Sequence, residues 1–278
     1  MSSSRIIQNI FKAYANKLEN IPQIPKNKKA LFSLMNCRTS EMGSTTYRCP
    51  EGHQSKEEFH SCRHRICSLC SHGKRKEWVD AQKQRIFNMP HFHVVFTIPE
   101  EYRIVWQFNE SLFTALLFRS SKETLLELTQ DKKYQGVTPG ILITLHTWGR
   151  QLQLHPHTHC VISAGGLDSQ NEWKEMSTYL FPSRVASVLH RGKIQSFLAE
   201  AAKSGELKLP PDLPLSEFWK LHSSLYKKSW NVRVEEQYQS GKGVVLYLAR
   251  YCKGGPLNPR QIKRCSDKEI LMSFKAHR

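Results

Sequence analysis

The sequence predicts an α+β protein: a central antiparallel sheet flanked by helices, preceded by a small helical domain with a cysteine-rich segment. Strand-like and helix-like segments follow one another irregularly in the second part of the chain, which favours an antiparallel sheet over regular strand–helix repeats. Four of the eight cysteines fall within 22 residues that are poor in aliphatic side chains. A chain of 278 residues is long enough for these parts to be two separate domains.

The first 36 residues are expected to form helices. Apolar residues from Ile6 to Leu18 recur at helical spacing, and a second short apolar stripe runs from Leu31 to Met35. A segment with two prolines separates the stripes. Packing into a core is the simplest explanation of both stripes, and we adopt it.

The remainder of the chain, from about residue 87, supplies the expected sheet and its helices. Short runs of β-branched and aromatic residues predict strands, and longer amphipathic runs predict helices. The expected strands are 92–99, 140–146 and 158–166, and the expected helices are 111–129 and 183–205. The stretch VEEQYQSGKGVVLYLARYC (234–252) is expected to be a loop that leads into a helix.

Basic residues dominate the charge of the chain. Lysine and arginine number 41 against 24 aspartate and glutamate, which gives a net charge of +17 with neutral histidine. An excess of this size favours a polyanionic partner such as nucleic acid, and the alternative is a merely basic soluble protein. No apolar run reaches the ~18 residues of a membrane span, and the N-terminus lacks the pattern of a signal peptide. We therefore expect a cytoplasmic protein without a membrane partner.

The cysteine-rich segment YRCPEGHQSKEEFHSCRHRICSLC has the spacing of a metal site. A Cys-x-x-Cys turn, here Cys67 and Cys70, places two thiolates within reach of one tetrahedral ion at ~2.3 Å. The second pair of ligands must come from three candidates, and we prefer Cys49 and His53, with Cys62 as the substitute. Zinc fits, because it accepts mixed sulfur and nitrogen ligands and needs no redox chemistry.

A closed site of four ligands would be structural, and its binding free energy would fold a segment that lacks an apolar core. Basic residues surround it, so the folded segment would present positive charge to the phosphates of DNA. These DNA-binding candidates are Arg63, Arg65, Lys74, Arg75 and Lys76. The alternative is a set of free thiols brought together by chance.

A second candidate metal site lies in LHPHTHCVIS (154–163). Successive side chains of a strand point to opposite faces, so His157 and His159 share a face, about 6–7 Å apart along the strand. A third ligand should come from a neighbouring strand, where we favour His146 over His155. Three ligands leave the ion coordinatively open, which is the character of a catalytic site. On its own, a His-x-His pair is more often structural or incidental.

Tyr247 and Tyr251, in VLYLARYCKGG, stand one turn apart on the same face of the expected helix. Packing is the usual explanation of such a pair. The alternative is that both hydroxyls point at a reactive centre. A phenol has a pKa of ~10 and is a poor nucleophile. A divalent ion would therefore have to activate the phosphodiester that it attacks. DNA would then stay attached as a phosphotyrosine, and a free 3′-hydroxyl would leave. No nucleotide cofactor is needed, and the sequence contains no Walker-type phosphate loop.

Taken together, three segments resemble the two-tyrosine HUH transposases of rolling-circle insertion sequences, the insertion-sequence-ninety-one type. These segments are CPEGH…SCRHRICSLC, LHPHTHCVISAGG and YLARY. HFHVVFTIPE (91–100) is also similar to that family's first catalytic-domain strand. In order along the chain, the resemblance covers residues from about 30 to 262.

The resemblance implies an HUH endonuclease-like catalytic domain after a zinc-binding domain. Residues 1–80 would be the N-terminal helices and the zinc-binding domain, 85–262 the catalytic domain, and 263–278 a C-terminal stub of a longer region. It implies Tyr247 and Tyr251 as nucleophiles, with Mg²⁺ or Mn²⁺ as the catalytic ion. Zn²⁺ would be structural.

The implied partners are single-stranded DNA at the ends of a mobile element and its target DNA. The enzyme would nick and rejoin these strands through 5′-phosphotyrosine intermediates. Two departures are visible: many relatives carry Cys-x-x-Cys where this chain has CPEGH, and this chain stops soon after the tyrosine helix. The alternatives are a rolling-circle replication initiator or relaxase, and a non-catalytic zinc-dependent DNA-binding protein or inactive remnant.

Overall fold

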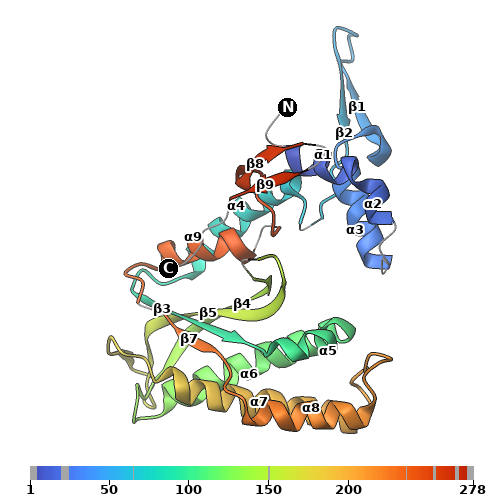
Figure 1. Cartoon of the computed structure of the whole chain (residues 1–278). Helices are drawn as coiled ribbons and strands as arrows, with labels where there is room; N and C mark the ends of the chain where they lie inside the picture. The colour runs from blue at the N-terminus through green and yellow to red at the C-terminus, as the bar shows by residue number, and fades with distance from the viewer. Residues whose placement is uncertain are drawn as a thin grey trace. The chain divides into compact units, whose positions relative to one another are not determined.

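The computed structural model describes residues 5–19, 25–64, 66–149, 151–235, 237–252, 255–266 and 269–273 (Figure 1). The chain divides into two compact units. One comprises Met1–Gln82 together with Ala249–Arg278, and the other comprises Lys83–Leu248. The first division lies close to the boundary expected near residues 80–85. The last part of the chain clusters with the N-terminal unit, whereas we expected a separate stub.

The N-terminal unit contains the expected helices and, in addition, two small hairpins and a long helix. Its elements are α1 (Ile6–Ala13), α2 (Ala15–Glu19), α3 (Pro25–Asn36), η2 (Ser40–Met42), β1 (Ser44–Arg48), β2 (Ser55–Phe59), most of α4 (Ser68–Arg85), η4 (Pro259–Gln261), β8 (Ile262–Cys265) and β9 (Ile270–Met272). Gln8 of α1 is buried and donates hydrogen bonds to the carbonyl groups of Met35 and Cys37. This side chain fixes the end of α3 and the residue that follows it.

The hairpin of β1 and β2 is exposed along its whole length and has no apolar core of its own. Its strands pair in antiparallel register from Ser44↔Phe59 to Arg48↔Ser55. At its base, the backbone N–H of Arg38 donates to the carbonyl of His60, and the N–H of His60 donates to that of Gly43. The antiparallel pairing therefore brings the chain before the hairpin back to the chain that follows it.

The larger unit is built on a five-stranded sheet whose neighbouring strands all pair in antiparallel fashion. The strand order is β4-β5-β3-β7, and β6 pairs with β5. The strands are β3 (His91–Thr97), β4 (Thr138–Trp148), β5 (Leu154–Leu167), β6 (Trp173–Glu175) and β7 (Val232–Val234). The predicted α+β class with a central antiparallel sheet is confirmed.

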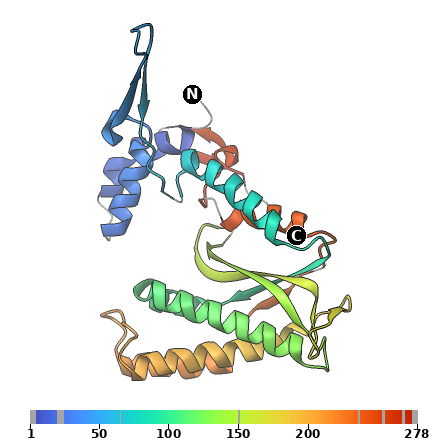
Figure 2. The same ribbon diagram turned by 180° about the vertical axis from the view of Figure 1, so that it is seen from behind.

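Helices cover one face of this sheet, as Figures 1 and 2 show from opposite sides. The helices on this face are η3 (Glu100–Tyr102), α5 (Arg103–Phe108), α6 (Glu110–Gln130), α7 (Ser183–Lys203) and α8 (Leu215–Lys227). The first part of α9 (Gly241–Cys252) also belongs to the unit and lies on the opposite face, where Tyr247 contacts His93 of β3. One apolar cluster fills the space between the sheet and α6 and α7, with Phe92, Phe96 and Ile162 at its centre. None of the helices in the described residues is long and apolar enough to cross a membrane.

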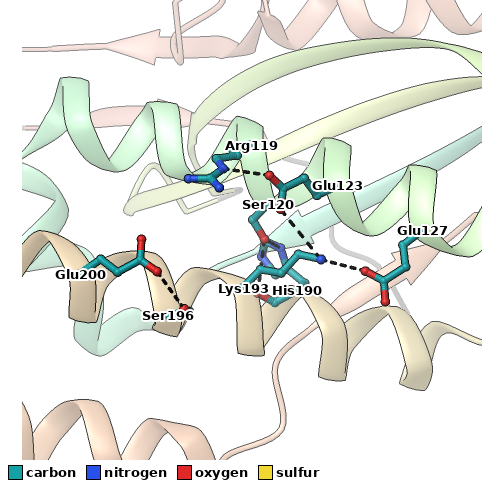
Figure 3. Close-up of polar contacts among 8 residues, drawn as sticks. All are labelled: Arg119, Ser120, Glu123, Glu127, His190, Lys193, Ser196 and Glu200. Carbon is teal, nitrogen blue, oxygen red and sulfur yellow. Dashed lines mark hydrogen bonds and ion pairs between the residues drawn. The ribbon is translucent and has the colours of Figure 1, made fainter.

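Polar contacts fix α6 against α7 (Figure 3). The hydroxyl of Ser120 lies 2.8 Å from Nδ1 of His190, and both residues are fully buried. On the exposed side of the same interface, the Lys193 ammonium lies 2.8 Å from the Glu127 carboxylate and 3.9 Å from that of Glu123. The α6–α7 layer is thus held in register beneath the sheet by an internal hydrogen bond and a surface ion pair.

Candidate metal and tyrosine sites

Three histidines of β4 and β5 converge on the face of the sheet opposite α6. His146 and His157 are partners in the β4–β5 register, and His159 follows two residues later on the same face. Nδ1 of His146 lies 3.0 Å from Nε2 of His157, which lies 3.1 Å from Nε2 of His159. The structure therefore brings together the three residues that the sequence suggested as one ligand set.

Strand β5, which carries His157 and His159, is hydrogen-bonded to helix α6 on its opposite face. Thr158 points to the opposite face of β5, and its hydroxyl lies 2.7 Å from that of Ser121 in α6. Nδ1 of His157 lies 2.6 Å from the carbonyl of His155, to which it donates. That bond places the ring proton of His157 on Nδ1 and leaves Nε2 as a lone pair facing the other two rings.

The histidine triad fits a divalent cation. Each of the three side chains is about nine-tenths buried or more, and each contributes one nitrogen to the same point. Burial lowers the pKa of His157 to about 4 and lowers the pKa of His159 further still. Both rings are therefore neutral at physiological pH, as metal ligation requires. Two nitrogens bound to one ion at ~2.1 Å and at right angles lie about 3.0 Å apart, which matches the observed spacing.

Helix α9 brings Tyr247 close to this triad. The Tyr247 ring meets His93 of β3 edge-on, with ring centroids 5.6 Å apart, and Nε2 of His93 lies 2.8 Å from Nδ1 of His159. The start of α9 also approaches β3 closely, because a side chain at Gly241 would come within 2.8 Å of His91. Only one imidazole ring thus separates Tyr247 from a member of the triad.

The structure describes the side chain of Tyr238 but not that of Tyr251. Tyr238 is half-buried, and its ring lies 6.1 Å from His93 and 6.2 Å from Tyr247 between centroids. Tyr251 lies on the last turn of α9, and its side chain falls outside the described part of the chain. Sequence reasoning missed His93 and Tyr238, although His93 lies in the HFHVVFTIPE segment that it singled out.

Four cysteines of the N-terminal unit converge in a second cluster. These are Cys37, Cys62, Cys67 and Cys70, whose sulfur atoms all lie within 4.8 Å of one another. Sγ of Cys70 is 3.4 Å from Sγ of Cys37 and 3.8 Å from Sγ of Cys62. Thiolates bound to one zinc at ~2.3 Å in a tetrahedron lie about 3.8 Å apart, so the donor set fits zinc.

The composition of this cluster differs from the set we preferred from the sequence. Cys49 and His53 are not part of it: they lie at the turn of the β1–β2 hairpin, with Sγ of Cys49 4.0 Å from Nδ1 of His53. Cys37 takes a place in the cluster, and Cys62, the expected substitute, takes another. The hairpin explains the difference, because its closed base brings Cys37 and Cys62 together while its turn projects away along five residue pairs.

Backbone N–H groups around the cysteine cluster donate hydrogen bonds to its sulfur atoms. The N–H of Cys62 donates to Sγ of Cys37 at 3.4 Å, and the N–H of His64 donates to Sγ of Cys62 at 3.4 Å. Arg38 and Arg63, which each follow one of these cysteines, have left-handed backbone angles (φ 58° and 53°). The repeated Cys-Arg dipeptide is the sequence signal that would have pointed to Cys37.

Comparison with known proteins places the chain in a family. A family model described as "Putative transposase" matches residues 140–278, which is half of the chain, and one described as "Transposase zinc-binding domain" matches residues 6–98. The chain belongs to this transposase family. The resemblance found in the sequence, the function as a transposase and the enzyme class are thereby confirmed.

Two curated relatives match the transposase over most of its length. "Putative transposase y4qJ" of Sinorhizobium fredii is 29% identical over 280 residues, which cover 98% of this chain and 70% of that protein. "Transposase for insertion sequence element IS801" of Pseudomonas savastanoi pv. phaseolicola is 29% identical over 265 residues, which cover 91% of this chain and 62% of that protein.

Among solved structures, the transposase resembles the conjugative relaxase TrwC. In complex with a 27-mer DNA comprising the recognition hairpin and the cleavage site, TrwC is 12% identical and matches 57% of this chain and 71% of its own, with a TM-score of 0.32. The metal-bound complex with oriT DNA gives 13% identity and a TM-score of 0.33, over 58% and 70% of the two chains.

The basic candidates of the transposase lie beside its cysteine cluster. Arg63, Lys74 and Lys76 are exposed, and Arg75 is half-buried. The ammonium of Lys74 donates to the carbonyl of Arg63 at 2.7 Å, which ties the start of α4 to the loop that carries Cys62. Arg65 lies outside the described residues.

Proposed function

We propose that this transposase nicks and rejoins single-stranded DNA, with Tyr247 as a nucleophile beside a divalent ion held by His146, His157 and His159. One observation carries the proposal: the ring of Tyr247 packs on His93, which is itself hydrogen-bonded to His159. A packing role would explain a tyrosine on a helix, but it would not require three converging neutral imidazoles next to it. Tyr251, one helical turn later, is proposed as the second nucleophile.

The proposed reaction is a transesterification. Oη of Tyr247 attacks the scissile phosphorus, the bond between phosphorus and the 3′ oxygen breaks, and a 5′-phosphotyrosine forms. The phenol loses its proton and the departing 3′ oxygen gains one, so the phosphodiester is exchanged and no nucleotide cofactor enters. Rejoining is the reverse attack by a 3′-hydroxyl on the phosphotyrosine. A second tyrosine allows one DNA end to be held while another is cut.

Mg²⁺ or Mn²⁺ is the proposed ion of the histidine triad. When bound, such an ion polarises the phosphodiester and stabilises the charge that develops on its oxygens. The chain's own contribution is to hold three neutral nitrogens at one point and to leave the remaining coordination positions to substrate. The donation from His157 to the His155 carbonyl keeps that ring oriented.

The N-terminal unit is proposed to hold zinc through the four clustered cysteines and to bind DNA through the basic residues beside them. Burial raises the pKa of the Cys37 thiol to about 11, so that side chain becomes a thiolate at neutral pH only when a cation replaces its proton. The proposed substrates are single strands from the ends of the mobile element and its target DNA, in the cytoplasm. The relatives' names as transposases support this choice of substrate.

Covalent adduct formation tests the proposal. The protein is incubated with Mn²⁺ and a labelled single strand from the end of its own element, and the products are separated on a denaturing gel. Tyr247→Phe and Tyr251→Phe should each remove part of the protein–DNA adduct, and the double variant should remove all of it. Tyr238→Phe is the matched control, because that ring also contacts His93 but belongs to no part of the proposed chemistry.

The outcomes separate the candidates clearly. Loss of the adduct in Tyr238→Phe, with full adduct in the other two single variants, would show that Tyr238 is the nucleophile and that the proposal names the wrong tyrosines. An undiminished adduct in the double variant would contradict both assignments. The phenylalanine variants keep the ring contacts, so a folding defect is not expected to produce either result.

A further inference from the structure

We infer that His93 is a positioning residue that orients the metal ligand His159 and supports the Tyr247 ring at the same time. This inference rests on the proposed role of the histidine triad as a metal site. His93 stands on β3, the neighbour of β5, and its side chain is 1% exposed. His93 is not one of the three converging ligands, so any effect it has on the ion acts through His159.

The hydrogen bond between the two rings fixes which nitrogen of His159 faces the ion. Nε2 of His159 belongs to the triad, 3.1 Å from Nε2 of His157. An ion at the triad takes the lone pair on Nε2, so the ring proton of His159 must reside on Nδ1. Nε2 of His93, 2.8 Å from that Nδ1, is placed to accept it. His93 thereby selects the tautomer of His159 that ligation needs.

The same bond leaves Nδ1 of His93 as a buried donor without a hydrogen-bond partner in the described residues. When Nε2 of His93 accepts, its proton resides on Nδ1, and within the described part of the chain no group hydrogen-bonds that atom. A buried donor without a partner is destabilising. An apolar ring would fill this position without that penalty, so the histidine is better explained by its bond to His159 than by packing.

The second contact of His93 links the ion site to the proposed nucleophile. Its ring stacks on His159 with an interplanar angle of 14° and meets Tyr247 at 66°. An acceptor nitrogen is needed for the first role, whereas an aromatic ring is needed for the second. Two substitutions therefore separate them: His93→Phe keeps the ring and removes the acceptor, and His93→Gln keeps an acceptor and removes the ring.

Binding of Mn²⁺ to the ion-free protein, measured by isothermal titration calorimetry, tests the first role. We expect His93→Phe to weaken Mn²⁺ binding 10–100-fold, the usual effect of losing the partner of a metal-bound histidine. His93→Gln should recover most of that loss. His91→Phe is the matched control, since it removes a buried imidazole from the same strand whose Nδ1 bonds to the carbonyl of Met89 and not to the triad.

Equal Mn²⁺ affinity in wild type and His93→Phe would overturn the role of His93. Failure of the wild-type protein to bind Mn²⁺ at all would contradict the metal site itself, which is a different result.

Discussion

At the scale of single residues, buried histidines account for most of the unusual chemistry of the larger unit. Burial lowers the pKa of His93 and His157 to about 4 and that of His190 to about 3. His157 meets two other imidazoles, whereas His190 meets a serine hydroxyl and the rings of Phe96 and Trp230. Burial thus keeps His157 neutral in the proposed metal site and keeps His190 neutral within the packed core.

The first prediction concerns the loss of stability in acid. His190 is neutral in the folded protein down to about pH 3, but an unfolded histidine binds a proton below about pH 6.5. Stability contributed by the neutral ring is therefore fully present above pH 6.5 and falls as the pH drops. The loss is about 1.4 kcal/mol per pH unit, or about 2 kcal/mol between pH 6.5 and pH 5.

Urea unfolding at several pH values checks this prediction. Glutamine does not titrate. In His190→Gln the slope of the unfolding free energy against pH below pH 6.5 should therefore decrease by about 1.4 kcal/mol per pH unit, the contribution of one proton. The other buried histidines keep the remaining slope in both proteins. Identical slopes in the variant and the wild type would show that His190 is protonated in the folded state as readily as in the unfolded chain.

The second prediction separates the two metal sites. His157→Ala should reduce covalent adduct formation by a factor of about 10² or more, because the ion loses a central ligand. Zinc content, measured by atomic absorption, and DNA binding, measured by fluorescence anisotropy, should stay close to wild type, because the four cysteines belong to a different compact unit. A joint loss of zinc and DNA binding would contradict the independence of the sites.

At the scale of elements, an exposed hairpin decides which cysteines form a cluster. β1 and β2 have no buried side chain, so their pairing alone does not stabilise them. What anchors the hairpin is its base, where Cys37 precedes β1 and Cys62 follows β2. In the proposed zinc site the ion and the hairpin would depend on each other, because the closed hairpin brings Cys37 and Cys62 together and the ion would bind both thiolates.

A cysteine comparison tests this arrangement. Cys37→Ser should lower the zinc content well below one ion per chain and destabilise the N-terminal unit, because it breaks the cluster. Cys49→Ser is the matched control at the hairpin turn and should retain zinc. Zinc content by atomic absorption and thermal unfolding by circular dichroism supply the readouts. Zinc loss in Cys49→Ser with retention in Cys37→Ser would restore the ligand set first expected from the sequence.

The sequence predicted elements well where a local pattern determines them. The two-residue period of His157 and His159 and the apolar strand before His146 were sufficient to suggest the triad, because antiparallel neighbours meet at a predictable register. Cys37 was missed because its approach to Cys62 depends on the closure of a hairpin whose strands are polar. The helix α8 was missed because a run of prolines precedes it and only Phe218 and Leu225 are buried.

At the scale of the whole molecule, the net charge of +17 is the clearest feature. Binding to DNA should therefore depend on salt. Each phosphate contact with a single strand contributes about 0.7 to the slope of log K against log salt, so five contacts lower affinity about 100-fold between 50 and 200 mM. Fluorescence anisotropy with a labelled single strand measures this slope.

Substitution of two basic residues localises the effect. Lys74→Ala combined with Lys76→Ala should lower the slope by about 1.4, the share of two contacts. Lys220→Ala, which removes an exposed lysine paired with Glu217 on α8, should leave the slope unchanged. A flat response to salt in the wild type would argue against phosphate contacts altogether.

The central claim is that a phenol next to the histidine triad becomes joined to DNA, and mapping the joined residue tests it most directly. The covalent complex formed with Mn²⁺ is digested with protease and nuclease, and the peptides are analysed by mass spectrometry. The account predicts a nucleotide phosphate on peptides that contain Tyr247 or Tyr251. A phosphate found on Tyr238, or on no tyrosine of the chain, would contradict it.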